Sequence, residues 1–170
     1  MGATDSLRIR QAESAADIET ARTLFLEYAA WLEIDLCFQG FAAELAGLPG
    51  AYAPPRGRLL LAEAGGATAG CVALRPLAAD ASGATCELKR MWVRPGFRGL
   101  HAGRALLEAA LAEARACGYL RIKLDTIPAK MPAAVALYRR LGFTECAPYY
   151  ESLIPDALYL ECALQTGPPG

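Results

Sequence analysis

Residues 86–111 read CELKRMWVRPGFRGLHAGRALLEAAL, and this stretch is the most informative part of the sequence about the fold. Residues 85–93 form a run typical of a β-strand, and Pro95 ends it. From Gly103 onward apolar residues recur at helical spacing, so we predict a long helix that ends near Gly118. The stretch is therefore a strand, a glycine-bearing loop and a helix, in that order.

The loop between this strand and this helix has the composition of an anion site. N–H groups at the start of a helix point outward at the positive end of the helix dipole, and they bind phosphate through backbone donors. Five basic residues and no acidic residue fall within positions 88–107, which gives this segment a charge of +5. The loop lacks the G-x-x-x-x-G-K-[ST] and G-x-G-x-x-G patterns, so Walker A and dinucleotide-binding loops are excluded. An anionic ligand of another kind is expected, and on the loop alone a purely structural turn stays open.

The flanking segments predict a chain that alternates strands and helices. We expect further strands at 7–10, 59–63, 68–74, 121–126, 143–146 and 157–164, and further helices after Ser14, at 36–48 and at 134–141. This order predicts an α/β (α+β) layer fold. Because no internal repeat or long linker divides the chain, we expect a single domain over residues 1–170 with an ordered core of about 7–164.

Together with the downstream LYRRLGF (137–143), the opening stretch resembles the GCN5-related N-acetyltransferase (GNAT) superfamily. The family's pyrophosphate motif, Q/R-x-x-G-x-G/A after a strand, reads here from Arg98 to Gly103, with His101 in place of the middle glycine. The resemblance runs through residues 86–145. It implies a central mixed, mostly antiparallel twisted sheet of six to seven strands, with a V-shaped splay between the fourth and fifth strands and helices on both faces.

The resemblance also implies acetyl-CoA as the cofactor and CoA as a product. The strand before the loop would offer backbone groups to the pantetheine arm, and the loop amides would cradle the pyrophosphate. Arg98 and Arg104 would add positive charge there, with a solvated basic face as the alternative. Met131 stands where the family often has an asparagine, so backbone groups or water would replace that contact. The residues expected to contact the coenzyme are Met91, Trp92, Val93, Arg98, Gly99, Leu100, His101, Ala102, Gly103, Arg104, Met131 and Tyr138.

His101 raises a question of backbone conformation. If the turn requires a positive φ at this position, a residue other than glycine costs roughly 1 kcal/mol. Its backbone N–H can still donate to a ligand. We expect the amide to be used and the imidazole to point toward solvent or the phosphates of the coenzyme.

Two residues are expected to be catalytic. Tyr138 matches the family's tyrosine that faces the coenzyme sulfur, and a phenol with a pKa of ~10 is suited to protonate a thiolate. Glu87 lies where some family members have a glutamate that acts as general base through water. On a regular strand Glu87 and Val93 would share one face. The alternatives are a core aromatic for Tyr138 and a structural ion pair for Glu87.

The acceptor site is expected among the N-terminal helices, which line it in this family. Residues 1–50 hold eight acidic residues and three arginines, a balance that suits a cationic amine. Solvated helix faces and core packing are the alternatives. The weak substrate-binding candidates are Trp31, Glu33, Asp35 and Phe38.

The function predicted from the sequence is an acetyl-CoA-dependent N-acetyltransferase that moves an acetyl group to the primary amine of a small molecule. The amine attacks the thioester directly, with a general base and a general acid. A protein lysine or N-terminal acetyltransferase and a non-catalytic acyl-CoA-binding sensor domain are the alternatives.

Composition narrows the partners and the compartment. The chain is 54% hydrophobic with a net charge of −1, and it has no apolar run near the ~18 residues that a membrane helix needs. No signal peptide is visible, and the six cysteines form no C-x-x-C pair, so we expect buried thiols and a cytoplasmic protein. With one histidine we expect no metal site. We expect no nucleic-acid or membrane partner, and we keep a homodimer open.

Overall fold

The computed structural model describes residues 6–36, 40–152 and 154–164. Within these residues the strands are β1 (Arg8–Gln11), β2 (Arg58–Ala64), β3 (Ala67–Pro76), β4 (Thr85–Val93), β5 (Arg121–Thr126), β6 (Thr144–Glu145) and β7 (Leu158–Ala163). The helices are α1 (Ala15–Leu32), α2 (Phe41–Ala46), α3 (Ala102–Ala116) and α4 (Pro132–Arg140), with short 3-10 turns η2 (Gly50–Tyr52) and η3 (Pro95–Phe97).

Residues next to α1 and α2 explain where these helices begin and end. The Ser14 side chain accepts a hydrogen bond from the backbone N–H of Asp17, and the Asp17 carboxylate accepts one from the N–H of Ser14, both at 3.1 Å. This capping box confirms the predicted start of α1. Helix α2 is shorter than the predicted 36–48 because it begins after Gly40, at φ 71°, and ends at Gly47.

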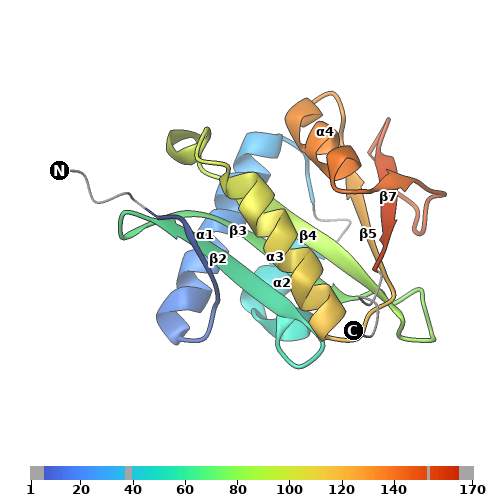
Figure 1. The fold of residues 1–170 in the computed structure, drawn as a ribbon, viewed down its shortest axis with the longest axis horizontal. Helices are drawn as coiled ribbons and strands as arrows, with labels where there is room; N and C mark the ends of the chain where they lie inside the picture. The colour runs from blue at the N-terminus through green and yellow to red at the C-terminus, as the bar shows by residue number, and fades with distance from the viewer. Residues whose placement is uncertain (1–5, 37–39, 153, 165–170) are drawn as a thin grey trace, which may run out of the picture.

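The sheet is mixed and mostly antiparallel, as predicted. Its strand order is β1-β2-β3-β4-β5-β7-β6, and within the described residues β4 and β5 are the one parallel pair. These two strands pair through residues 85–87 and 121–123, and both continue beyond that point. Figure 1 shows them diverging from their shared start. This divergence is the predicted V-shaped splay between the fourth and fifth strands.

A β-bulge interrupts β4 near its middle. Arg90 has a φ of 58°, and the register between β3 and β4 shifts there so that β4 contains one extra residue. Leu88 and Val93 consequently pack in the same core, although regular alternation would put them on opposite faces. Glu87, next to Leu88, faces the other side of the sheet. The expectation that Glu87 and Val93 share a face is therefore wrong, because the bulge reverses the alternation.

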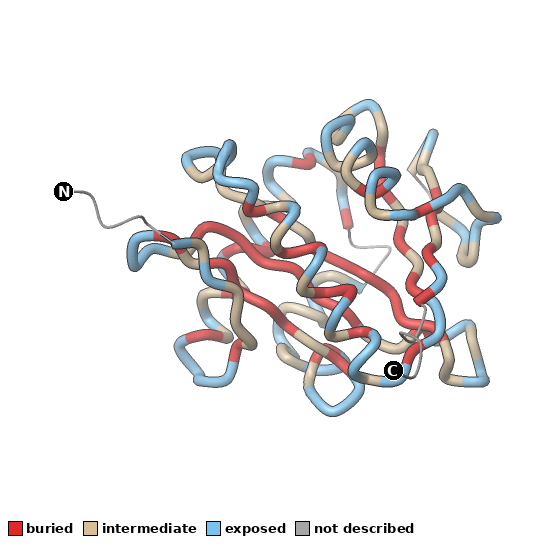
Figure 2. Tube along the Cα trace, viewed as in Figure 1, coloured by how far each residue is buried: buried red, intermediate tan, exposed pale blue. Residues whose placement is uncertain are grey.

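Helices cover both faces of the sheet. Figure 1 shows α3 and α4 in front of the strands and α1 and α2 behind them. The front core contains Leu106 of α3 and Tyr138 of α4, and the rear core contains Phe25 of α1 and Trp92 of β4. Figure 2 shows the buried segments running along the central strands and along the inner sides of the helices.

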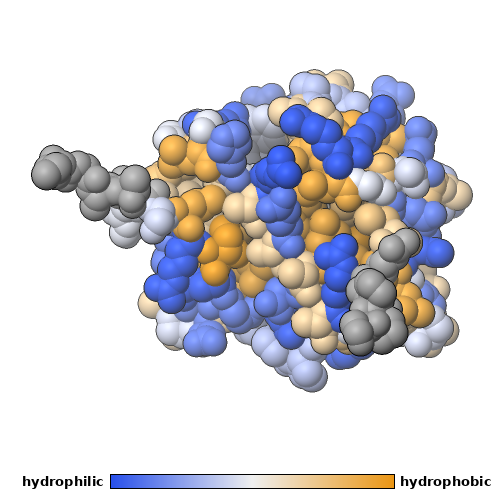
Figure 3. Space-filling model, viewed as in Figure 1, coloured by the Kyte–Doolittle hydropathy of each residue, from blue (hydrophilic) through white to orange (hydrophobic). Residues whose placement is uncertain are grey.

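The surface over α3 and α4 is mixed in character. Figure 3 shows hydrophilic side chains interspersed with hydrophobic ones across this face. Among the described helices, none is both long enough and apolar enough to cross a membrane. The described cysteines are free thiols, with Cys71, Cys86 and Cys162 buried and Cys117 and Cys146 half-buried, while Cys37 lies outside the described residues.

Candidate active site

A cavity of about 470 Å³ opens where β4 meets the loop before α3. We call it the outer cleft. Its walls come from α1, the end of β4, the start of α3 and the start of α4. The residues that line it are Tyr28, Trp31, Met91, Trp92, Val93, Arg98, Gly99, His101, Ala102, Gly103, Lys130, Met131, Pro132, Ala133, Ala134 and Leu137.

The start of α3 faces this cleft with free backbone donors. His101 is the N-cap residue, at φ 58° and ψ 25°, and within the described chain its side chain makes no capping hydrogen bond. The turn therefore does require a positive φ at His101. Ala102 and Gly103, the first residues of the helix, both border the cleft. First-turn N–H groups at the positive end of a helix dipole form a site for phosphate.

Arg98 lies in an aromatic clamp on the wall of the outer cleft. Its guanidinium carbon is 5.7 Å from the ring centre of Trp31 and 5.4 Å from that of Trp92. The two tryptophan rings are themselves 5.4 Å apart. Cation–π contacts of this kind restrain a side chain that would otherwise move freely in solvent. The clamp places a positive charge close to the helix start.

The splayed strands supply a second set of backbone groups. Within the described residues, β4 has no partner on its β5 side after Glu87, yet it continues to Val93. Unpaired N–H and C=O groups along a strand bind an extended ligand as an added strand would. This edge borders the outer cleft through residues 91–93.

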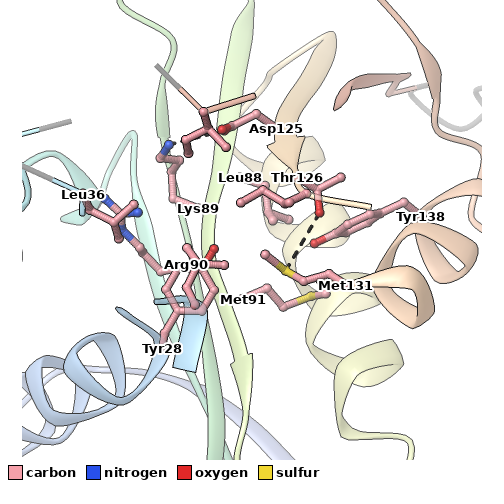
Figure 4. A pocket seen from close by; sticks show the side chains of 13 residues that line it. Tyr28, Leu36, Leu88, Lys89, Arg90, Met91, Asp125, Thr126, Met131 and Tyr138 are labelled. Carbon is pink, nitrogen blue, oxygen red and sulfur yellow. Dashed lines mark hydrogen bonds and ion pairs between the residues drawn. The ribbon is translucent and has the colours of Figure 1, made fainter. Parts of the chain in front are cut away.

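Deeper in the molecule is an inner pocket of about 40 Å³, drawn in Figure 4. It shares Tyr28, Met91 and Met131 with the outer cleft, so the two cavities adjoin. Room of this size holds a water molecule or a group of similar bulk. Its lining is Tyr28, Leu32, Leu36, Leu88, Lys89, Arg90, Met91, Asp125, Thr126, Ile127, Met131, Tyr138 and Ile154.

Tyr138 forms one wall of the inner pocket. Figure 4 shows its ring entering from α4 beside Met131, whose sulfur accepts a hydrogen bond of 3.9 Å from the Thr126 hydroxyl. The Tyr138 ring centre lies 5.6 Å from that of Phe143, and the residue is 4% exposed. Burial raises the pKa of the Tyr138 phenol well above its usual range. Burial likewise raises the pKa of Tyr28 to about 12, so both phenols keep their protons at neutral pH.

A third cavity, of about 500 Å³, lies on the other side of Lys89. We call it the charged cavity. Lys89 lines both this cavity and the inner pocket. The complete lining is Ala51, Arg75, Pro76, Leu77, Ala78, Ala79, Glu87, Lys89, Tyr149, Tyr150 and Glu151.

Buried ion pairs connect this cavity to the bulge in β4. Glu87 lies between Arg75 and Lys89, with an N–O distance of 3.3 Å to each. The Lys89 ammonium also lies 3.5 Å from a carboxylate oxygen of Asp125. In the other direction Arg75 contacts Glu44 at 3.6 Å, and Glu44 pairs with Arg90 of the bulge at 2.9 Å. Three acids and three bases alternate here, so the buried charges compensate one another.

Strand β4 therefore passes all three cavities. Its last residues line the outer cleft, Met91 borders both the cleft and the inner pocket, and Lys89 borders both the inner pocket and the charged cavity. The outer cleft and the inner pocket therefore adjoin, and the charged cavity lies beyond Lys89, the one described residue that lines both it and the inner pocket. Among the described residues, no group of three or more His, Cys, Asp or Glu side chains is arranged to hold a metal ion.

Comparison with known families agrees with this geometry. The model of the acetyltransferase (GNAT) family matches residues 18–143. The chain belongs to the GNAT family of acetyltransferases. The match extends from within α1 to beyond the end of α4, so it includes the outer cleft and all of the inner-pocket lining except Ile154.

Individual relatives give the same picture of this acetyltransferase. An uncharacterized N-acetyltransferase of Schizosaccharomyces pombe is 37% identical over 145 residues, covering 85% of this chain and 86% of the relative. An acetyltransferase of the GNAT family from Staphylococcus aureus has a TM-score of 0.75 at 21% identity, covering 94% of this chain and 100% of its own. A Salmonella typhimurium protein solved with its cofactor acetyl-CoA has a TM-score of 0.67 at 21% identity, covering 95% of each chain. The two structural likenesses establish the fold.

The structure gathers most of the residues expected to contact the coenzyme. The outer cleft is lined by nine of them: Met91, Trp92, Val93, Arg98, Gly99, His101, Ala102, Gly103 and Met131. Leu100 is 48% exposed and does not line the cleft. Arg104 is also outside the lining, and it pairs with Glu108 at 2.8 Å one helical turn away on the exposed face of α3. Tyr138 lies deeper, in the inner pocket.

The four weak substrate-binding candidates are not brought together. Trp31 lies in the outer cleft against Arg98. Glu33 has a side chain that is 79% exposed and pairs with Lys130 at 3.7 Å. Asp35 is exposed as well, and Phe38 lies outside the described residues. The acidic N-terminal half therefore contributes Glu44 to the buried ion pairs, whereas Glu33 and Asp35 line none of the three cavities.

Several residues of the inner pocket and the charged cavity were missed by the sequence analysis. Tyr28, Arg75, Asp125, Tyr149 and Tyr150 belong to four separate segments, and no local motif links them. One available signal was the run ELKR within an otherwise apolar central strand. Charged side chains on a central strand are buried, and a buried charge requires partners from other elements.

Proposed function

We propose that this acetyltransferase uses acetyl-CoA to acetylate the primary amine of a small molecule. The observation that carries the proposal is the succession of cavities along β4. A cleft with phosphate-binding features leads to a small inner pocket beside Tyr138, and a separate cavity of small-molecule size lies on the other side of Lys89, which borders both the pocket and this cavity.

Each part of the coenzyme has a matching region in the outer cleft. The α3 N-terminus and Arg98 fit the negative pyrophosphate, and the unpaired β4 edge fits the amide-bearing pantetheine arm. The apolar surface of Met91, Met131 and Leu137 fits its methylene segments. Acetyl-CoA, when bound, supplies an acetyl group on a thioester. The inner pocket has room for that group and little more.

Within the inner pocket, Tyr138 is placed to act as the general acid. Because burial raises its pKa, the phenol is protonated at neutral pH and is a weak acid, so it gives its proton only as negative charge develops on the leaving sulfur. The incoming amine reaches the site as an ammonium and must lose a proton before it attacks. Glu87 and Asp125 are the carboxylates that border the charged cavity and the inner pocket, respectively. One of them accepts that proton.

The size of the charged cavity favours a small acceptor over a protein. Its volume of about 500 Å³ falls within the range of ordinary small-molecule sites. The rings of Tyr149 and Tyr150, with centres 5.4 Å apart, form an aromatic wall beside the buried carboxylates. An ammonium finds both cation–π and charge–charge contacts in such a place. A peptide acceptor is the alternative, with only its amine-bearing residue entering the cavity.

Thiol release from acetyl-CoA tests the proposal. The purified protein is incubated with acetyl-CoA and each of tyramine, putrescine, L-lysine, L-methionine and a short peptide with a free N-terminal alanine. We expect turnover with at least one small amine and little with the peptide. Preferential turnover of the peptide would favour the protein acetyltransferase. Tight binding of acetyl-CoA without turnover on any amine would contradict the proposal and favour a sensor.

A further inference from the structure

The two carboxylates that border the reaction site differ in where they lie. Of the described residues that line the inner pocket, Asp125 alone carries a carboxylate, and the same pocket contains Tyr138. Glu87 lines the charged cavity and not the inner pocket. Figure 4 shows Asp125 and Lys89 together at one end of the pocket, with Tyr138 on another wall. Asp125 is therefore the carboxylate that shares a cavity with the general acid.

Asp125 is held firmly in this position. It belongs to β5, and its side chain is 10% exposed. One carboxylate oxygen lies 3.5 Å from the Lys89 ammonium, and the other accepts a short hydrogen bond from the Tyr150 hydroxyl. A carboxylate offers about four lone-pair sites, so these two donors leave it able to accept another hydrogen bond. The side chain is oriented and still has capacity for a ligand.

The charge of Asp125 acts across the whole pocket. After burial, which is the main cause, Asp125 is among the charges that raise the pKa of Tyr138 and Tyr28. The Asp125 charge also contributes to the raised pKa of Tyr149 and Tyr150, which line the charged cavity. Two of these phenols line the inner pocket and two line the charged cavity, so they lie at the two ends of a route between the cavities that passes Lys89. A cation moving along that route is attracted toward Asp125.

Glu87 is differently surrounded. Its two oxygens each face a cation, the Arg75 guanidinium and the Lys89 ammonium, both at 3.3 Å. Among the described residues, Glu87 is in contact with two cations, whereas Asp125 is in contact with one, Lys89. The Arg90 guanidinium also lines the inner pocket, but its charge is compensated by Glu44 at 2.9 Å, so an approaching ammonium is repelled less at Asp125 than at Glu87. Glu87 sits instead where it fixes Lys89 at the junction of the two cavities. Its geometry is that of a positioning residue.

We propose that Asp125 is the general base that accepts the proton of the acceptor ammonium, and that Glu87 positions Lys89. This inference rests on the function proposed above. One proton passes from the ammonium to Asp125, and the nitrogen lone pair forms the C–N bond as the C–S bond breaks. A second N–H proton replaces the one that Tyr138 gives to the sulfur. The products are the amide, the CoA thiol and one proton, which leaves Asp125 for solvent.

The test compares Asp125→Asn with Glu87→Gln. Each substitution removes one negative charge at a similar distance from Lys89, so the two variants are matched in their effect on that residue. Thiol release is measured from pH 6 to pH 9.5 with the amine of the panel that the wild type acetylates fastest. Calorimetry with acetyl-CoA gives the coenzyme affinity of each variant, and thermal unfolding shows whether each variant is folded.

For Asp125→Asn we expect kcat/KM for the amine to fall by about 100-fold near pH 7, the usual scale for loss of a general base. The deficit shrinks as pH approaches the amine's own pKa, because the free amine needs no base. For Glu87→Gln we expect kcat/KM for the amine to fall by less than roughly 10-fold, and by the same factor at all pH values, because a positioning residue does not take part in the proton transfer. Acetyl-CoA affinity stays within about 2-fold in both, since neither residue lines the outer cleft.

Asp125→Glu keeps a carboxylate and is expected to restore the wild-type shape of the pH profile at a lower rate. If Asp125→Asn unfolds, the profile of this second variant carries the test. A pH-dependent deficit in Glu87→Gln, or a deficit in Asp125→Asn that is constant with pH, would overturn the inference. Failure of the wild type with every amine would instead overturn the proposed function itself, before any variant is compared.

Discussion

The outer cleft and the charged cavity are formed by different kinds of chemical group. The cleft uses backbone: a helix start, a bulged strand and an unpaired strand edge, all within a continuous stretch of about twenty residues, 85–104. The charged cavity uses side chains from β3, β4, the segment after β3 and the segment before β7. A ligand common to a family can be held by backbone geometry, whereas a particular acceptor has to be recognised by individual side chains. Variants that alter the backbone and variants that alter side chains should therefore have different effects.

The largest effect is expected where β3 approaches the bulge. A Cβ added at Gly70 would lie 2.3 Å from the Trp92 carbonyl oxygen, a clash with backbone that neither strand can relieve. Gly70→Ala should lower the free energy of unfolding by about 3 kcal/mol and abolish coenzyme binding. Chemical denaturation and calorimetry check this. Gly96→Ala is the matched control, because a Cβ there meets nothing within 4 Å. Equal stability of the two variants would contradict the close approach of β3 to the backbone of β4 at Gly70.

The next effect is expected in the inner pocket. Tyr138→Phe should lower kcat by about 100-fold and leave the affinity for acetyl-CoA unchanged, because it removes a proton donor and no binding surface. Since burial raises the pKa of Tyr138, the phenol stays protonated when an ordinary tyrosine would ionise, near pH ~10. Wild-type activity should therefore show no decline as pH rises to that value. Steady-state kinetics and a pH profile measure both. An unchanged kcat in the variant would remove Tyr138 from the mechanism.

A smaller effect separates the two arginines near the start of α3. Arg98→Ala should raise KM for acetyl-CoA by about 10-fold, and less at high salt, because it removes one charge from the phosphate site. Arg104→Ala should change it by less than about 2-fold, because Arg104 pairs with Glu108 away from the cleft. Initial rates at two salt concentrations give the comparison. Equal losses in the two variants would mean that general surface charge attracts the coenzyme.

The smallest effect concerns His101. At φ 58° a histidine is strained, and His101→Gly should raise the free energy of unfolding by about 1 kcal/mol. Acetyl-CoA should bind this variant at least as well as the wild type, because the backbone N–H is retained. Denaturation and calorimetry are again sufficient. A marked loss of affinity would show that the imidazole itself contacts the coenzyme.

The same comparison explains how much could be predicted from the sequence. The strand, loop and helix of residues 85–116 could be predicted because hydrophobic spacing and glycine placement are local properties. Eight of the residues expected at the coenzyme site lie in this stretch and line the outer cleft, and a ninth, Met131, was expected from the family resemblance. The bulge at Arg90 could not be predicted, because its position depends on how β3 packs against β4. It reversed the expected faces of Glu87 and Val93.

The acceptor side could not be predicted because it depends on pairings across the sheet. Asp125 and Lys89 are 36 residues apart in sequence, and they meet because β4 and β5 lie side by side before they diverge. Glu44 and Arg90 meet because α2 packs behind the sheet. Acidic residues in the N-terminal half suggested an amine site there, but Glu33 remains largely exposed. Charge composition alone does not say which carboxylates become buried.

The most direct test of this account is a crystal structure with CoA and the acetylated form of the amine that the enzyme prefers. We expect the pyrophosphate at the start of α3, the sulfur beside Tyr138 in the inner pocket, and the amine portion in the charged cavity within reach of Asp125. The contradicting result is a CoA that lies outside the outer cleft, or an amide whose amine portion enters from the same side as the coenzyme.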